Sequence, residues 1–359
     1  MDHKVISHSR PTLGRREEMA VRAVMHSGSI AQGIQVCKFE KSLASYTGRK
    51  FAVAVNTGLS ALHLSLIALK IREGDEVILP SYTCDALLNA VLYLNAKPVI
   101  VDVNYADGNI AYKSLRRYVK NKTKAILVPH SFGFPADMDE ILKVGVPVVE
   151  DCAVSMGAKY KNKRVGGFGR IAASSFYATK MLTTGEGGVV LTDDKKAADD
   201  IKQLRDYRGN KKFAIRYNYK MTDIAAAMGM VQLDRMDEFI EARRRIAAKY
   251  SLMLNRVEGV ILPGCNSFTE PVFYRYIVKL PNKDADKVIT AMAKHGISCG
   301  HGVLQPLHRL LGLPTAKYPN SEKLRKESVS LPIYPSLKER DVEYIAKEFI
   351  KIAGLIRCS

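Results

Sequence analysis

The sequence predicts an α/β protein with a largely parallel central sheet covered by helices on both faces. Through the first 200 residues, near-continuous apolar runs rich in β-formers alternate with helix-period runs, as in FAVAVN (51–56) followed by SALHLSLIALK. Strands buried on both faces lack polar alternation, which is typical of parallel sheets between helical layers. A chain of 359 residues is longer than a domain with one simple hydrophobic core usually is. We therefore expect a large domain over residues 1–250 and a smaller α/β domain over 251–359.

The strands and helices of the large domain are expected in regular order. After the first strand and helix, EVILP (76–80) predicts a strand and CDALLNAVLYLN a helix. Further strands are expected at 98–103, 124–130 and 147–151, with helical segments between most of them. The runs 171–178 and 187–193 are so close in sequence that we expect them to pair or to be neighbours.

The last third of the chain predicts a long helical region and then the smaller domain. The helical region covers about 223–255. A strand follows over 273–280, then a helix in DADKVITAMAKHG and a terminal helix in ERDVEYIAKEFIKIAGLI.

Composition favours a cytoplasmic protein without a membrane span or a metal site. The N-terminus lacks the apolar stretch of a signal peptide, and no window approaches the roughly 20 apolar residues of a membrane helix. The cysteines form no CxxC pair and no zinc spacing, so we expect reduced thiols. They lie at positions 37, 84, 152, 265, 299 and 358.

The formal net charge of +19 allows a nucleic-acid binder as an alternative. The longest basic run, Arg243 to Arg245, lies inside a predicted helix, where two or three of its side chains would simply face solvent, and the other charges are spread along the chain. We therefore favour a generally basic surface, which would attract an anionic small substrate, and do not expect nucleic acid as a partner.

A lysine between small residues and glycines is the strongest candidate for chemistry. Lys180 lies in SSFYATKMLTTGEGGV (174–189), with Ser175 five residues before it. Upstream, NTGLSALHL (56–64) predicts a strand, a turn and a helix. Gly58 would allow close approach of a ligand, and the amides of Leu59 and Ser60 at the helix N-terminus would bind a phosphate.

A carboxylate is expected at the same edge of the sheet. Asp151 ends the strand PVVED, and ligands of open α/β sheets bind outside the carboxyl ends of the strands. A phosphate site, a strand-end carboxylate and a lysine together describe pyridoxal 5′-phosphate (PLP), whose aldehyde forms a Schiff base with lysine and whose ring nitrogen pairs with an aspartate. We expect Lys180 to anchor the cofactor, Asp151 to keep its ring protonated, and Ser175 to help hold its phosphate.

The segments NTGLSALHL and SFYATKMLTTGEGG resemble motifs of the DegT/DnrJ/EryC1/StrS sugar aminotransferases, a family within fold-type I of the PLP enzymes. The resemblance covers nearly the whole chain. Further matches are Gly28, Gly33 and Phe39-Glu40, then GDEVILPSYT, VVEDCAVSMGA with VGGFG, YNYKMTDIAAAMG, QPLH and LPIYPSL.

The resemblance implies an aminotransferase that passes an amino group from an amino acid, most often glutamate, to a keto sugar attached to a nucleotide. Lys180 would also move the proton between the substrate and the cofactor. Asn218 would reach the phosphate from a second subunit, which implies a homodimer with shared active sites. His308 would lie near the substrate.

Two positions depart from the family pattern. Cys84 occupies the place of the aromatic residue that stacks on the ring, for which the nearby Tyr82 could substitute, and Val154 replaces the Gln or His that bonds the ring hydroxyl. Two alternatives stay open: the same chemistry on a cyclitol or another keto substrate, and a non-catalytic regulatory or nucleic-acid-binding protein. Among other candidates, His63 is expected in the core, and His130 could line the crevice.

Overall fold

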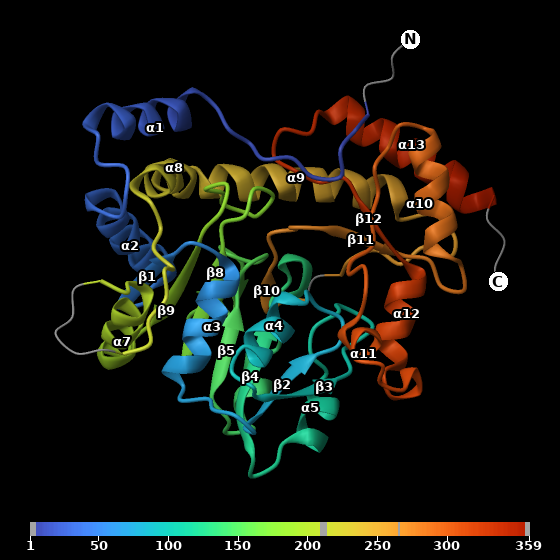
Figure 1. The fold of residues 1–359 in the computed structure, drawn as a ribbon. Coiled ribbons are helices and arrows are strands. Elements are labelled where there is room, and N and C mark those ends of the chain that lie inside the picture. Colours follow the sequence, from blue (N-terminus) through green and yellow to red (C-terminus); the bar gives the residue numbers. More distant parts are fainter. Residues whose placement is uncertain (1–4, 209–213, 265, 356–359) are drawn as a thin grey trace.

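A seven-stranded sheet forms the centre of the protein in a computed structural model that describes residues 5–208, 214–264 and 266–355 (Figure 1). The five strands from β8 to β3 run parallel, whereas β9 is antiparallel to both of its neighbours, β1 and β8. The expected mostly parallel sheet is therefore confirmed, and so is the pairing of 171–178 with 187–193. The strand order is β1 (Phe51–Val55), β9 (Gly188–Thr192), β8 (Ile171–Ser175), β5 (Val148–Asp151), β4 (Thr123–Pro129), β2 (Glu76–Pro80) and β3 (Lys97–Val101).

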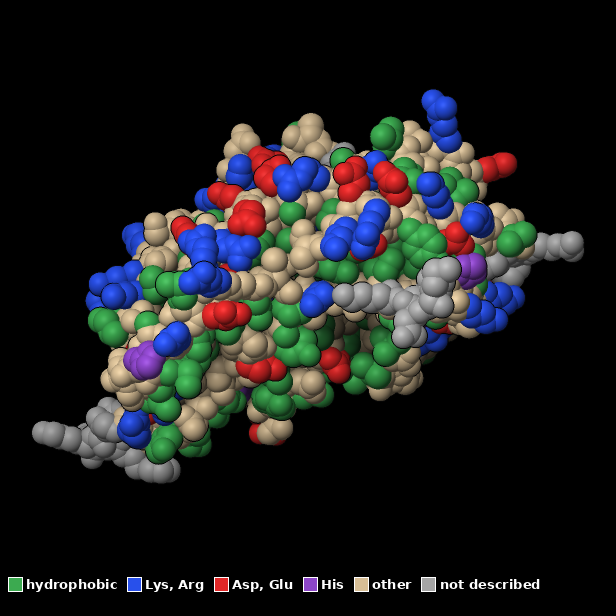
Figure 2. Space-filling view, turned by 90° about the horizontal axis from the view of Figure 1, so that it is seen from above, with side chains coloured by type: hydrophobic (Ala, Val, Ile, Leu, Met, Phe, Trp, Pro, Cys, Tyr) green, Lys and Arg blue, Asp and Glu red, His purple; other side chains and the backbone are tan. Residues whose placement is uncertain are grey.

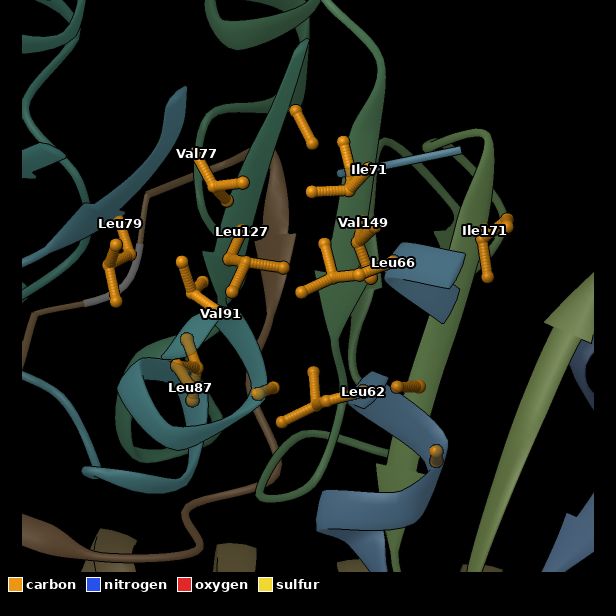
Figure 3. Packing of buried hydrophobic residues seen from close by; sticks show 14 of the residues in the cluster. Leu62, Leu66, Ile71, Val77, Leu79, Leu87, Val91, Leu127, Val149 and Ile171 are labelled. Atoms are coloured by element: carbon orange, nitrogen blue, oxygen red, sulfur yellow. The ribbon is translucent and has the colours of Figure 1, made fainter. Parts of the chain in front are cut away.

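Helices cover both faces of this sheet. One face packs against α3 (Gly58–Ala68), α4 (Ala86–Leu92) and α7 (Lys195–Arg205). Figure 3 shows Leu62 and Leu66 of α3 and Leu87 of α4 directed toward the strand residues Leu127 and Val149. The other face packs against α2 (Ile34–Thr47), α5 (Tyr112–Tyr118), α6 (Met138–Leu142) and α8 (Asp223–Asp234).

A smaller cluster forms around the C-terminal elements. The antiparallel pair β11 (Tyr276–Lys279) and β12 (Ser328–Leu331) packs with α10 (Ala285–Lys294) and α13 (Glu339–Leu355). The first described residues join this cluster: Ile6 bridges Ile297, and His8 Nε2 lies 2.8 Å from Ser330 Oγ. The N-terminal segment, which we had assigned to the large domain, thus contacts the small one.

The helix α9 (Met236–Leu254) belongs to both parts of the molecule (Figure 1). Its first turns pack on the sheet through Met236 and Ile240, and its last turns pack in the C-terminal cluster through Tyr250 and Leu254. A division of the chain near residue 250 therefore lies inside a continuous helix, and the domain boundary stays a proposal.

The remaining elements are short or peripheral. They are α1 (Arg15–Ser27), β6 (Lys159–Tyr160), β7 (Lys163–Arg164), β10 (Thr269–Glu270), α11 (Leu307–Leu310) and α12 (Pro319–Glu327), with two 3₁₀ turns at Ser131–Gly133 and Thr315–Lys317. No helix within the described ranges has the length and apolar character that crossing a membrane requires. Cys37, Cys84, Cys152 and Cys299 are free thiols, and Cys265 and Cys358 lie outside the described residues.

Basic side chains do not gather into one patch on the face seen in Figure 2. Lys and Arg alternate there with acidic and apolar side chains. The helix α7, for example, begins with two exposed lysines, Lys195 and Lys196. Each of them forms an ion pair with an aspartate one helical turn later. This distribution agrees with the generally basic surface expected from the composition.

The packing of α3 on the sheet predicts a large loss of stability for Leu66→Ala. Leu66 is fully buried against the strands, so its truncation leaves a cavity and should lower the free energy of unfolding by about 2–5 kcal/mol. The matched control is Leu252→Ala in α9, where the side chain is 72% exposed and the change should stay within about 0.5 kcal/mol. Denaturant unfolding measures both, and equal effects would contradict this packing.

Candidate active site

A cavity of about 650 Å³ opens at the carboxyl ends of β4, β5 and β8, the edge predicted for ligand binding. Seven of the ten predicted site residues line this cavity together: Gly58, Leu59, Tyr82, Cys84, Asp151, Ser175 and Lys180. Three others, Ser60, Asn218 and His308, do not line it within the described chain.

One end of the cavity is formed by the start of α3. Thr57 caps this helix by accepting a hydrogen bond from the Ser60 amide, 3.0 Å away. The Ser60 amide thus has a partner within the helix start, and its expected phosphate contact stays a prediction. The amides of Gly58 and Leu59 make no hydrogen bond within the described residues and remain available to an anion.

Close packing explains why a glycine begins this helix. A Cβ at Gly58 would lie 2.6 Å from the Ser175 Cβ and 3.0 Å from its hydroxyl oxygen. Only a residue without a side chain lets Ser175 approach the helix start. The Ser175 hydroxyl therefore lies beside the free amides, as a phosphate site requires.

Lys180 lies in the turn after β8, and its backbone amide donates to Tyr177 O at 2.9 Å. The neighbouring Met181 and Leu182 are buried, which fixes the turn. The amine Nζ lies 5.4 Å from the centre of the Tyr274 ring. Lys180 is thus held in the cavity wall and is not one more surface cation.

Asp151 is buried opposite Lys180. Its Oδ1 accepts a hydrogen bond of 2.9 Å from the Ala153 amide, the one hydrogen bond found for this side chain among the described residues. Burial raises the pKa of Asp151, and the Ala153 hydrogen bond and the positive charge of Lys180 partly offset that rise. A cationic ring nitrogen would be a favourable partner for this carboxylate.

The preceding residue, Glu150, faces the protein interior. Its carboxylate accepts hydrogen bonds of 2.7, 2.7 and 2.6 Å from the amides of Gly166, Phe168 and Gly169. Burial alone would raise its pKa, but the His130 hydrogen bond and those of the loop amides lower it.

His130 is a structural partner of Glu150 and does not line the cavity, so its suggested place in the crevice is wrong. Its Nδ1 accepts from the Ala136 amide at 3.0 Å, so Nε2 carries the proton donated to Glu150, 3.1 Å away. His130, Glu150 and Cys152 bring potential metal ligands within 4.8 Å of one another, but these hydrogen bonds already engage both ring nitrogens and both Glu150 oxygens. The other histidine expected inside, His63, is indeed in the core.

The two positions that depart from the family pattern both line the cavity. Cys84 lies near Lys180 and Asp151, whose charges act on its thiol, and Val154 offers no hydrogen-bonding group. Tyr82 is buried, with its ring packed edge-on against Phe132 at 6.1 Å between centres.

His308 is corrected as a substrate contact. Its side chain is fully buried, with Nδ1 2.5 Å from Ser81 Oγ and Nε2 2.7 Å from Glu322 Oε1. The ring also stacks on Tyr318. The Nδ1 contact therefore joins the 305–322 region to the turn after β2, and the Nε2 contact with Glu322 lies within that region.

Asn218 lies outside the cavity wall of its own chain. It is exposed, and its carbonyl accepts a hydrogen bond from Asn56 Nδ2 at 3.3 Å. Its expected contact with the phosphate requires a second subunit and stays a prediction.

Sequence reasoning missed several residues of the wall. Thr57, Tyr177, Glu186, Tyr274 and Arg275 all line the cavity. Burial alone would raise the pKa of Tyr274, but the charges of Lys180 and Arg275 and a Thr179 hydrogen bond lower it. The signal available in the sequence was the pair Tyr274-Arg275 at the start of FYRYIVKL, where a polar residue interrupts an otherwise apolar run.

The donor set fits PLP. Free amides and a serine hydroxyl suit a phosphate at one end, and a buried carboxylate with an unengaged oxygen suits the ring nitrogen. The Lys180 amine in the same wall suits the aldehyde.

Comparisons with known proteins agree with this chemistry. A model of the DegT/DnrJ/EryC1/StrS aminotransferase family matches residues 11–350. GDP-perosamine synthase from Escherichia coli O157:H7 is 34% identical over 96% of this chain and 97% of that protein. The aminotransferase TlmJ from Streptoalloteichus hindustanus has a TM-score of 0.92 at 30% identity, over 97% of this chain and 99% of that one. Spr1654 from Streptococcus pneumoniae, solved in its PLP form, has a TM-score of 0.92 at 26% identity, over 98% and 99%.

The similarities extend over both the sheet and the C-terminal cluster, and they confirm the expected fold, cofactor and class of enzyme. The chain belongs to the DegT/DnrJ/EryC1/StrS aminotransferase family of PLP-dependent enzymes.

Proposed function

We propose that the protein moves an amino group from an amino acid to a keto sugar carried by a nucleotide. The observation that supports this most is the single cavity that holds Lys180, Asp151 and the free amides of Gly58 and Leu59. The relatives that support the sugar nucleotide include GDP-perosamine synthase. Glutamate as the donor and a cytoplasmic location stay predictions.

Five residues of the cavity have a defined task in the proposed reaction. PLP supplies, when bound, an aldehyde and a ring that accepts electrons. The amides of Gly58 and Leu59 and the Ser175 hydroxyl hold its phosphate, and the Asp151 carboxylate holds the proton on its ring nitrogen. The Lys180 Nζ would hold the aldehyde carbon covalently, with loss of water, and, once released by the incoming amine, would carry the proton from the substrate Cα to that same carbon.

We infer further that the active unit is a homodimer. Three large apolar side chains at the cavity, Tyr177, Leu304 and Leu310, are 49%, 74% and 50% exposed. Exposed apolar groups beside a site favour a covering partner. A second copy of the chain would cover them and bring its Asn218 toward the phosphate.

The role of Lys180 predicts that Lys180→Ala removes the visible absorbance of the bound cofactor and lowers the transamination rate by about 10²–10⁴-fold, because both the covalent anchor and the proton carrier are lost. Lys195→Ala, on the exposed face of α7, is the control. Absorbance and stopped-flow kinetics measure the outcome, and an unchanged spectrum in Lys180→Ala would refute the assignment.

The proposed acceptor is tested with the pyridoxamine form of the enzyme. We expect keto sugar nucleotides to restore the absorbance of the aldehyde form, because a nucleotide adds binding energy that the bare sugar lacks. The same keto sugars without a nucleotide, and a keto cyclitol, are the comparison. Restoration by the cyclitol or the free sugar alone would point to the other keto substrates.

Shared active sites predict that two defective variants complement each other. Asn218→Asp would place a negative charge against the partner's phosphate site, whereas Lys180→Ala removes the amine. After subunit exchange, about a quarter of the sites should be intact, because each mixed dimer contains one unaltered site. No recovery of activity, together with a monomeric mass by light scattering, would exclude the shared site.

A further inference from the structure

One guanidinium in the cavity wall, that of Arg275, has no carboxylate partner among the residues that the structure describes. Arg275 lines the cavity just before β11, with its guanidinium carbon 5.5 Å from the Tyr274 ring centre. Lys180 Nζ lies 5.4 Å from the same centre, so both cations flank one ring. Within the described ranges, the hydrogen bonds of the guanidinium go to His8.

Several other shielded arginines of the protein have oxygen partners, and Arg243 donates to the carbonyls of Tyr274 at 3.3 Å and Ile333 at 3.0 Å. Arg49 binds Asp193 at 2.8 Å, and Arg235 binds Glu17 at 2.9 Å. Removing a guanidinium from water without an anion costs free energy, so an unpaired one at a cavity is a candidate for ligand binding.

The backbone holds Arg275 in place. Its amide donates to Phe132 O at 3.2 Å, and the Val272 amide donates to Gly133 O at 3.0 Å. Gly133 has a φ of +93°, and a Cβ there would lie 2.8 Å from the Tyr274 amide nitrogen. The segment that carries Arg275 is therefore docked tightly on the turn after β4.

His8 contacts the guanidinium without cancelling its charge. Arg275 Nη1 lies 3.3 Å from Nδ1 and 3.2 Å from Nε2 of His8. Burial, and secondarily the charge of Arg275, lowers the pKa of His8 to about 3, so the ring is neutral near pH 7. The N-terminal segment thus orients the guanidinium and leaves its positive charge for a ligand.

The cavity wall offers few other cations to an anionic substrate. Its described ionisable residues include the acids Asp85, Asp151 and Glu186 and the cations Lys180 and Arg275. In the proposed function Lys180 serves the cofactor, which leaves Arg275 as the cation of this wall that can face the substrate.

We propose that Arg275 binds the anionic group of the substrate, either the carboxylate of the amino donor or the phosphate of the sugar nucleotide. A guanidinium presents paired N–H groups that match both anions. This inference rests on the proposed function, because it assigns a substrate contact within the same cavity.

Titrations of the PLP-loaded protein test the proposal and separate the two sources of the anion. Glutarate, a dicarboxylate without an amine, and a nucleoside diphosphate are added separately, and binding is followed by calorimetry. Arg275→Met should weaken the binding of one of them by about 10–100-fold, and Arg275→Lys should recover only part of the loss. Arg170→Met is the control, since Arg170 is an exposed arginine that pairs with Asp194.

The pattern of losses identifies the anion. A loss confined to glutarate assigns Arg275 to the carboxylate of the donor, and a loss confined to the nucleoside diphosphate assigns it to the phosphate. If Arg275→Met binds glutarate and the nucleoside diphosphate with unchanged affinity, the proposal is overturned. The proposed function still holds in that case, provided that the protein shows the visible absorbance of bound PLP. If the wild-type protein lacks that absorbance, the proposed function fails first and this inference with it.

His8 is tested as a positioning residue in a double-mutant cycle. We expect His8→Ala to weaken binding of the same anion less than Arg275→Met does, and to add little in the double variant, because both changes act on one guanidinium. Full additivity of the two effects would overturn the role of His8.

Discussion

A carboxylate without access to solvent, Glu150, organises the catalytic edge of the sheet. Three loop amides and His130 hold its charge, and Arg49 Nη2 lies 3.6 Å away. An ion buried without such partners would be strongly unfavourable, so the loop 166–169 and β4 must stay where they are. Because successive strand residues point to opposite faces, fixing Glu150 inward directs Asp151 to the cavity. The Glu150 carboxylate therefore stabilises the fold, and the neighbouring Asp151 carboxylate is available to the cofactor.

The cavity is assembled from two kinds of element with different constraints. The residues proposed to hold PLP end β5 and β8, follow β8 or begin α3, and all of them depend on the central sheet. The residues that would face the substrate, such as Arg275 and Leu304, come from segments that connect C-terminal elements. Connecting segments change more readily than sheet strands. A shared cofactor chemistry can therefore accompany different acceptors within one family.

The sequence allowed most of the fold and the cofactor side of the site to be predicted, because those signals are local. Lys180 and Asp151 follow apolar strands, and parallel strands bring their carboxyl ends to one edge. His308 was misassigned because its partner Ser81 is 227 residues away in the chain. Arg275 was missed for the same reason, since its position depends on docking to the turn at Phe132. The strand β12 has only four residues, which is too short a run to predict a strand from the sequence.

The helix α9 has a mechanical consequence. Over its 19 residues it contains neither glycine nor proline, and it is embedded at one end in the sheet packing and at the other in the C-terminal cluster. Sharp kinks in helices occur almost always at such residues or at irregular turns. Rotation of the C-terminal cluster against the central sheet would have to bend α9 along its whole length. The helix therefore offers no hinge for such a rotation. Any movement that admits a substrate would then be confined to the connecting segments that line the cavity.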